Sequence, residues 1–170
     1  MLVLRCTGNV LKRFRQRPRQ VEVSATASGL GEWYMNTADD LLGRFYVVVH
    51  AKSLYGVVVD GASVPSIGDL VERMLERLAR HMASLGIRQA AQEKVLAGYE
   101  HFLVAKTASR SVLGSMNDLT THLYLNMAAQ MGATGKLDLW AIEQKLDNMP
   151  QRPIGWGFPS ERFAELCAAL

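Results

Sequence analysis

The stretch RFYVVVHAKSLYGVVVDG, residues 44–61, decides the fold class. It contains two runs of β-branched and aromatic residues, 45–49 and 54–59, which the polar stretch HAKS separates. Such runs are typical of β-strands, and the short separator predicts a hairpin, although two parallel or split strands would give the same pattern. Apolar runs at 1–6 and 101–106 add two more strands. The sequence therefore predicts a small mixed β-sheet.

Helical periodicity dominates the remainder of the chain. Ser66 and Asp69 have the spacing of a capping box, and apolar residues from Ile67 to Met82 then recur on one helical face. Because these helices lie largely after the strands, we expect an α+β fold in which a helix-rich C-terminal half covers the sheet. Further helices are predicted at 10–17, 33–43, 87–98, 116–131, 139–149 and 160–170, with Asp138 and Ser160 as caps of the last two.

Length and composition indicate one domain spanning residues 1–170. The chain has 170 residues, 49% of them hydrophobic, which is enough for a single core. No apolar run approaches the roughly 18 residues that a membrane span needs, so no membrane is expected. The first charges follow an apolar run, whereas a secretory signal has its charges first, and we therefore expect a cytoplasmic protein. Cys6 and Cys167 have neither disulfide nor zinc spacing, so no metal and no cofactor are predicted.

Positive charge is concentrated at the N-terminus. The segment from Met1 to Val21 contains no acidic residue, although the net charge of the whole chain is only +3. Such a cluster is typical of a phosphate-backbone contact, but a solvated amphipathic helix followed by an arm would look the same. The six basic residues are Arg5, Lys12, Arg13, Arg15, Arg17 and Arg19.

The second candidate site lies in AKTASRSVLGSMNDL, residues 105–119. Ser115 and Asp118 have capping-box spacing, so a helix start at residue 116 accounts for both. The preceding loop then carries two cations and three hydroxyl groups ahead of a helix N-terminus, an arrangement that suits an anion. A hydroxyl-rich turn without any ligand is the alternative. The loop residues concerned are Lys106, Thr107, Ser109, Arg110 and Ser111.

Two histidines are candidates for acid/base chemistry. His50 separates the two strongest strands, and His122 lies in the apolar helix that starts near residue 116. Each could equally be a hydrogen-bonded core residue. If strand 102–106 shares a sheet with strand 45–49, we expect His50 and Arg110 to lie near one end of it.

Four segments resemble an uncharacterised bacterial family of domains of unknown function. They are LRCTGNVLKRF, GEWYMNTADDLLGRFYVVVHAKSLYGVVV, AKTASRSVLGSMNDL and KLDNMPQRPIGWGFP, and their most specific piece is RSVLGSMND at 110–118. The resemblance covers nearly the whole chain and implies a domain found alone or joined to plasmid-type open-reading-frame domains. It implies no mechanism, but a mobile-element setting would favour a nucleic-acid or toxin–antitoxin role.

Three functions are consistent with these patterns. The leading one is a non-enzymatic binding module that contacts nucleic acid, or another polyanion, through the basic N-terminal segment. The second is a metal-independent ribonuclease or phosphotransfer-type enzyme acting at the loop 106–111, with a histidine as base. The third is an antitoxin-like partner of a protein encoded nearby, or a homo-oligomer, that uses the apolar C-terminal helices.

Overall fold

A five-stranded mixed sheet forms the centre of the computed structural model, which describes residues 1–19 and 30–170. The strand order is β4-β3-β2-β1-β5. β1 is parallel to both β2 and β5, whereas β2, β3 and β4 are successively antiparallel. The predicted hairpin is thus confirmed as β3 and β4. The bounds are β1 (Leu2–Cys6), β2 (Glu32–Asp40), β3 (Gly43–His50), β4 (Gly56–Asp60) and β5 (Phe102–Lys106).

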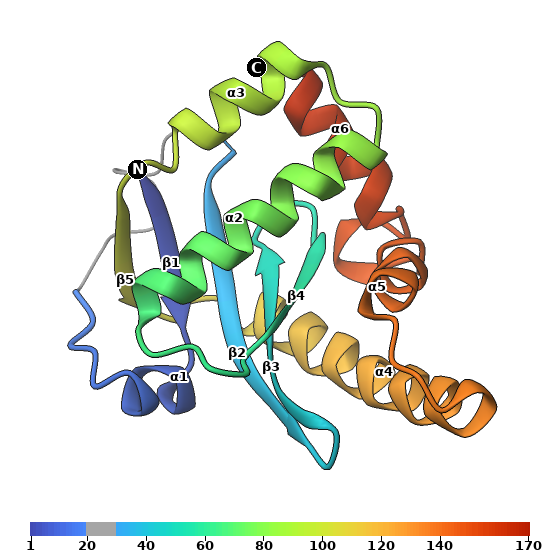
Figure 1. Cartoon of the computed structure of the whole chain (residues 1–170). Coiled ribbons are helices and arrows are strands. Elements are labelled where there is room, and N and C mark those ends of the chain that lie inside the picture. The colour runs from blue at the N-terminus through green and yellow to red at the C-terminus, as the bar shows by residue number, and fades with distance from the viewer. Residues whose placement is uncertain (20–29) are drawn as a thin grey trace.

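Helices cover both faces of the sheet (Figure 1). One core packs strand residues such as Leu4 and Met35 against α1, α2, α3 and α6. The other packs Val47 and Val58 against α4 and α5. The α+β class and the helix-rich C-terminal half are confirmed. The helices are α1 (Gly8–Arg13), α2 (Ile67–Ser84), α3 (Gln89–Ala97), α4 (Arg110–Thr134), α5 (Leu139–Asp147) and α6 (Pro159–Ala168), with one 3₁₀ turn at Arg152–Ile154.

The expected helix at 33–43 is wrong, because this segment forms the central strand β2. Its backbone pairs with β1 on one side and with the whole of β3 on the other. Trp33 and Met35 face one core while Tyr34 faces the other, so every side chain of WYM is buried by strand alternation. Burial on both faces outweighs the helix-like spacing of the apolar residues.

Helix starts were predicted correctly at two of four positions. Ser66 and Asp69 form the capping box of α2, and Asp138 accepts a bond from the Ala141 N–H at the start of α5. Ser115 is not a cap, because α4 begins five residues earlier with Ser109 accepting from the Val112 N–H. Ser160 is not one either, since α6 begins at Pro159, whose fixed φ suits a first helical position.

Two further findings concern the described residues. None of their helices combines the length and the apolar character required to span a bilayer. The loop or weak edge strand expected at 18–32 lies mostly outside the described residues, but Arg19 pairs with Ala105 on the outer edge of β5.

Candidate functional site

Five of the six N-terminal basic residues are exposed. Lys12 and Arg13 end α1, and the other three are at alternate positions in the segment 15–19 that follows this helix. None of the five forms an ion pair with a carboxylate in residues 1–19 and 30–170. The Arg13 guanidinium lies 5.7 Å from the centre of the Phe14 ring. The five exposed residues are Lys12, Arg13, Arg15, Arg17 and Arg19.

The structure brings this segment beside the second candidate site. The Arg19 N–H donates to the Val104 carbonyl at 3.0 Å, and Arg19 pairs in parallel with Ala105. Lys106, the next residue of β5, is exposed, and it pairs with Cys6 at the carboxyl end of β1, which leads directly into α1. Arg19 and Lys106 therefore lie close together although they are about 90 residues apart in sequence, and we call the exposed cations of the N-terminal segment together with Lys106 the basic corner: Lys12, Arg13, Arg15, Arg17, Arg19 and Lys106.

Arg5 has a different role from its neighbours, because it is buried. Its guanidinium bonds both carboxylate oxygens of Glu32, at 2.6 and 2.8 Å, and also the Lys106 carbonyl at 2.9 Å. The hydrogen bond with Glu32 raises the pKa of Arg5 above its ordinary value, which keeps the pair ionised. Arg5 thus links β1 to the first residue of β2 and to the last residue of β5. Because it is buried, it is not placed to contact a ligand.

The loop after β5 uses its hydroxyl groups partly for capping. Ser109 caps α4, and its own N–H donates to the Tyr34 hydroxyl at 3.1 Å. Thr107 is half-buried, while Lys106, Arg110 and Ser111 are exposed. A turn without a ligand therefore explains Ser109. It does not explain Lys106, Arg110 and Ser111, which are exposed to solvent.

His50 does not lie near Arg110, so the expected pairing is wrong. The two strands do share the sheet, but β3 runs antiparallel to β2, which places His50 opposite Trp33 at the amino end of β2. Its ring is fully buried and bonds Ser53 and the Leu30 carbonyl. Burial lowers the pKa of His50 to about 4, so this ring is a neutral core residue at physiological pH.

His122 does share a pocket with Arg110. The pocket has a volume of about 400 Å³ and lies between α4 and the turn 149–156. Ser111, Asp118 and His122 line it from one face of α4, since spacings of seven and four residues return to the same side of a helix, and Arg110 lines it from the first turn beside Ser111. We call it the α4 pocket.

Sequence reasoning missed the other wall of this pocket. Arg152 and Trp156 line it from the turn that follows α5. The one available signal was Trp156 itself, a large aromatic residue between two glycines in a proline-bounded segment, but nothing in the sequence places that segment across α4.

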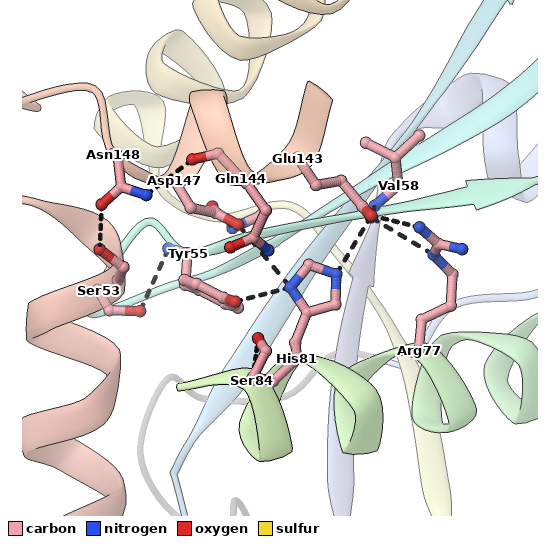
Figure 2. A network of polar contacts seen from close by, with 12 residues as sticks. Ser53, Tyr55, Val58, Arg77, His81, Ser84, Glu143, Gln144, Asp147 and Asn148 are labelled. Atoms are coloured by element: carbon pink, nitrogen blue, oxygen red, sulfur yellow. Dashed lines mark hydrogen bonds and ion pairs between the residues drawn. The ribbon is translucent and has the colours of Figure 1, made fainter. Parts of the chain in front are cut away.

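A buried polar network was also missed (Figure 2). Glu143 of α5 accepts hydrogen bonds from Arg77 of α2 and, at 2.6 Å, from the Val58 N–H. The Nε2 atom of His81 lies 3.2 Å from the same carboxylate, and the Tyr55 hydroxyl lies 2.6 Å from His81 Nδ1. All of these side chains except that of Arg77 are buried.

The network provides hydrogen-bond acceptors for backbone N–H groups at the edge of the sheet. β4 is an edge strand, and its outward Gly56 and Val58 N–H groups donate to the carboxylates of Asp147 and Glu143, one helical turn apart on α5. Burial raises the pKa of Asp147 well above its ordinary value, with a further contribution from nearby Glu143. Its carboxylate Oδ2 has no hydrogen-bond partner among the described residues. Because the groups are enclosed and two of the carboxylates accept backbone N–H groups of β4, we assign them a structural role.

These features define a class of protein: a small α+β domain with a basic corner at the carboxyl ends of its parallel strands and a pocket beside its longest helix. The chain belongs to the family described as a domain of unknown function (DUF6933), which matches residues 3–162. Neither the curated proteins nor the solved structures gave a match. This match confirms the expected resemblance to a family of domains of unknown function.

Proposed function

We propose that this domain is a non-enzymatic module that binds a polyanion, most directly nucleic acid, through the basic corner. The single observation that carries the proposal is the backbone pairing of Arg19 with Ala105. Because of this pairing Arg19, the last exposed cation of the segment after α1, lies next to Lys106, although the two are about 90 residues apart in sequence.

The charge arrangement fits a phosphate backbone better than a single small anion. Six exposed cations in a corner without a carboxylate partner among the described residues would each approach a separate phosphate. Each neutralised phosphate releases condensed counterions, so affinity should fall steeply as salt rises. Phosphate contacts carry little sequence information, and we expect binding with weak base preference.

Fluorescence anisotropy with labelled single- and double-stranded oligonucleotides, over a series of salt concentrations, tests this function. A triple variant, Lys12→Gln, Arg17→Gln and Lys106→Gln, removes three charges from the corner. The matched control, Arg88→Gln, Lys145→Gln and Arg162→Gln, removes the same charge from exposed positions elsewhere. We expect the corner variant to lower the slope of log K against log salt by about two to three, since each phosphate contributes about 0.7 to 0.9.

Equal effects of the two triple variants would contradict the proposal, because binding would then depend on net charge alone. The proposal would also be contradicted if neither the single-stranded nor the double-stranded oligonucleotide bound detectably at low salt. The apolar C-terminal helices would then be the surface to test with protein partners.

A metal-independent ribonuclease or phosphotransfer activity is the second candidate function. The observation in its favour is the presence of His122, Arg110 and Ser111 in one pocket. In this proposal His122 accepts the proton of the ribose 2′-hydroxyl as that oxygen bonds to phosphorus, the bond from phosphorus to the 5′-oxygen breaks and the leaving oxygen takes a proton from water, while Arg110 stabilises the negative charge on the phosphoryl oxygens. Cleavage of a labelled RNA in the presence of a chelator should be lost in His122→Ala and Arg110→Ala and retained in His50→Gln; cleavage that survives the first two variants would exclude this assignment.

A further inference from the structure

We infer that the α4 pocket binds a nucleoside monophosphate, or a single nucleotide of similar chemistry, between α4 and the turn 149–156. The inference concerns binding and rests neither on the basic corner nor on catalysis. The pocket volume of about 400 Å³ is within the usual range for small-ligand sites, roughly 300 to 1,000 Å³.

Two arginines line the pocket from opposite walls. Arg110 belongs to the first turn of α4, and Arg152 begins the 3₁₀ turn after α5. Both are exposed, and neither pairs with a carboxylate in the described part of the chain. Guanidinium groups bind phosphate oxygens in a bidentate manner, so two of them around one concavity favour a phosphorylated ligand.

Trp156 supplies a surface for a planar ring. Its side chain is 67% exposed, more than that of any other aromatic residue in the described ranges. The backbone there has φ of 63°, a left-handed conformation that is strained for a bulky residue. The turn is nevertheless held firmly, because the N–H groups of Gln151 and Trp156 bond the Gly157 and Gln151 carbonyls, each at 3.0 Å. An exposed indole on a hydrogen-bonded turn is a typical stacking platform for a base.

Asp118 limits the kinds of phosphorylated ligand that suit the α4 pocket. It lines the pocket on the same face of α4 as Ser111 and His122 and has no ion-pair partner among the described residues. A carboxylate disfavours a highly charged polyphosphate but accepts hydrogen bonds from ribose hydroxyls, as in dinucleotide sites. Two arginines, one carboxylate and one indole therefore match a phosphate, a sugar and a base within one small molecule.

Titration of isotope-labelled protein with AMP, GMP, CMP and UMP tests the inference by NMR. The chain has three tryptophans, so three indole N–H signals are expected, and only that of Trp156 should shift on addition of nucleotide. Trp33 is fully buried in the opposite core and serves as an internal reference. Inorganic phosphate and ribose 5-phosphate are the comparison ligands, and both should bind at least fivefold more weakly because neither can stack.

Two variants separate binding from folding. Arg152→Gln should weaken the nucleotide at least tenfold, while Arg162→Gln, an exposed arginine outside this pocket, should leave affinity within twofold. Trp156→Gly removes the ring at a position whose positive φ suits glycine, so it should abolish nucleotide binding while the fold, monitored by circular dichroism, is retained.

Three results would overturn the inference: no shift of the Trp156 signal with any nucleotide at millimolar concentration, equal affinity for inorganic phosphate and nucleotide, or unchanged affinity in both Arg152→Gln and Trp156→Gly. The corner variant Lys12→Gln, Arg17→Gln and Lys106→Gln should retain nucleotide affinity. Loss of oligonucleotide binding in that variant, with the nucleotide still bound, would distinguish the two sites, and nucleotide binding lost there would assign the ligand to the corner instead.

Discussion

Removal of the Glu143 carboxylate should destabilise the domain by several kcal/mol, because three groups depend on it. The Val58 N–H donates to Oε1 at 2.6 Å, Arg77 donates to the same carboxylate, and His81 Nε2 lies 3.2 Å from Oε2. In Glu143→Ala the Val58 N–H loses its partner in a buried position, which costs about 1 to 3 kcal/mol. The one deleted methylene group, Cγ, adds about 0.8 kcal/mol.

The loss of the ion pair adds less, because the Arg77 side chain is 24% exposed and water can solvate it. We therefore expect Glu143→Ala to lower the free energy of unfolding by about 2 to 5 kcal/mol. Glu143→Gln keeps an acceptor for Val58 while losing the charge, and it should cost less than half as much.

Urea unfolding followed by far-UV circular dichroism measures both values, provided that the m-value is unchanged. Glu165→Ala is the matched control, since its carboxylate pairs with Arg162 on the surface and should contribute less than about 1 kcal/mol. An effect of Glu143→Ala below about 1 kcal/mol, or equal effects of the Ala and Gln substitutions, would refute the argument that this carboxylate stabilises the edge strand as an acceptor.

Three further outcomes are expected. Because burial raises the pKa of Asp147, the native state keeps this proton at pH values where the unfolded chain has released it. Stability therefore falls as pH rises above the ordinary pKa of a carboxyl group, and Asp147→Asn should flatten that fall in thermal unfolding followed over a pH series. Gly132→Ala, with open space around the new Cβ, should raise the unfolding free energy by about 0.5 to 1 kcal/mol, whereas Gly61→Ala, with Cβ 2.7 Å from Tyr46, should lower it. Burial raises the pKa of Cys6 to about 12, so alkylation detected by mass spectrometry should be absent in the native state and appear on unfolding.

Local patterns in the sequence predicted most elements of the fold but not the central strand. The valine-rich runs of β3 and β4 have high β propensity and few alternatives, so they could be identified directly. β2 contains Asn36, Thr37 and Asp39, and its apolar residues also fit a helical spacing. Only pairing with β1 and β3 on both sides makes it a strand, and such non-local contacts are not encoded in a short window.

The sequence predicted which residue types belong to the candidate sites, but not which of these residues lie close together. Charge alone identified the exposed arginines, yet it could not exclude Arg5, whose buried guanidinium depends on the carboxylate of Glu32 on the neighbouring strand β2. His50 and Arg110 were expected together because the direction of β3 relative to β5 is not visible in either segment. Trp156 and Arg152 reach α4 only through the path of the chain after α5, which has no local signature.

The carboxylates that occupy the outer edge of β4 also bear on aggregation. Gly56–Asp60 includes three consecutive valines, and a free edge of that composition would pair readily with the same segment of another molecule. Asp147 and Glu143 occupy the Gly56 and Val58 N–H groups that such pairing would use. Detachment of α5 would therefore do more than loosen one helix, since it would free these two N–H groups and make the edge of the sheet a template for fibril growth.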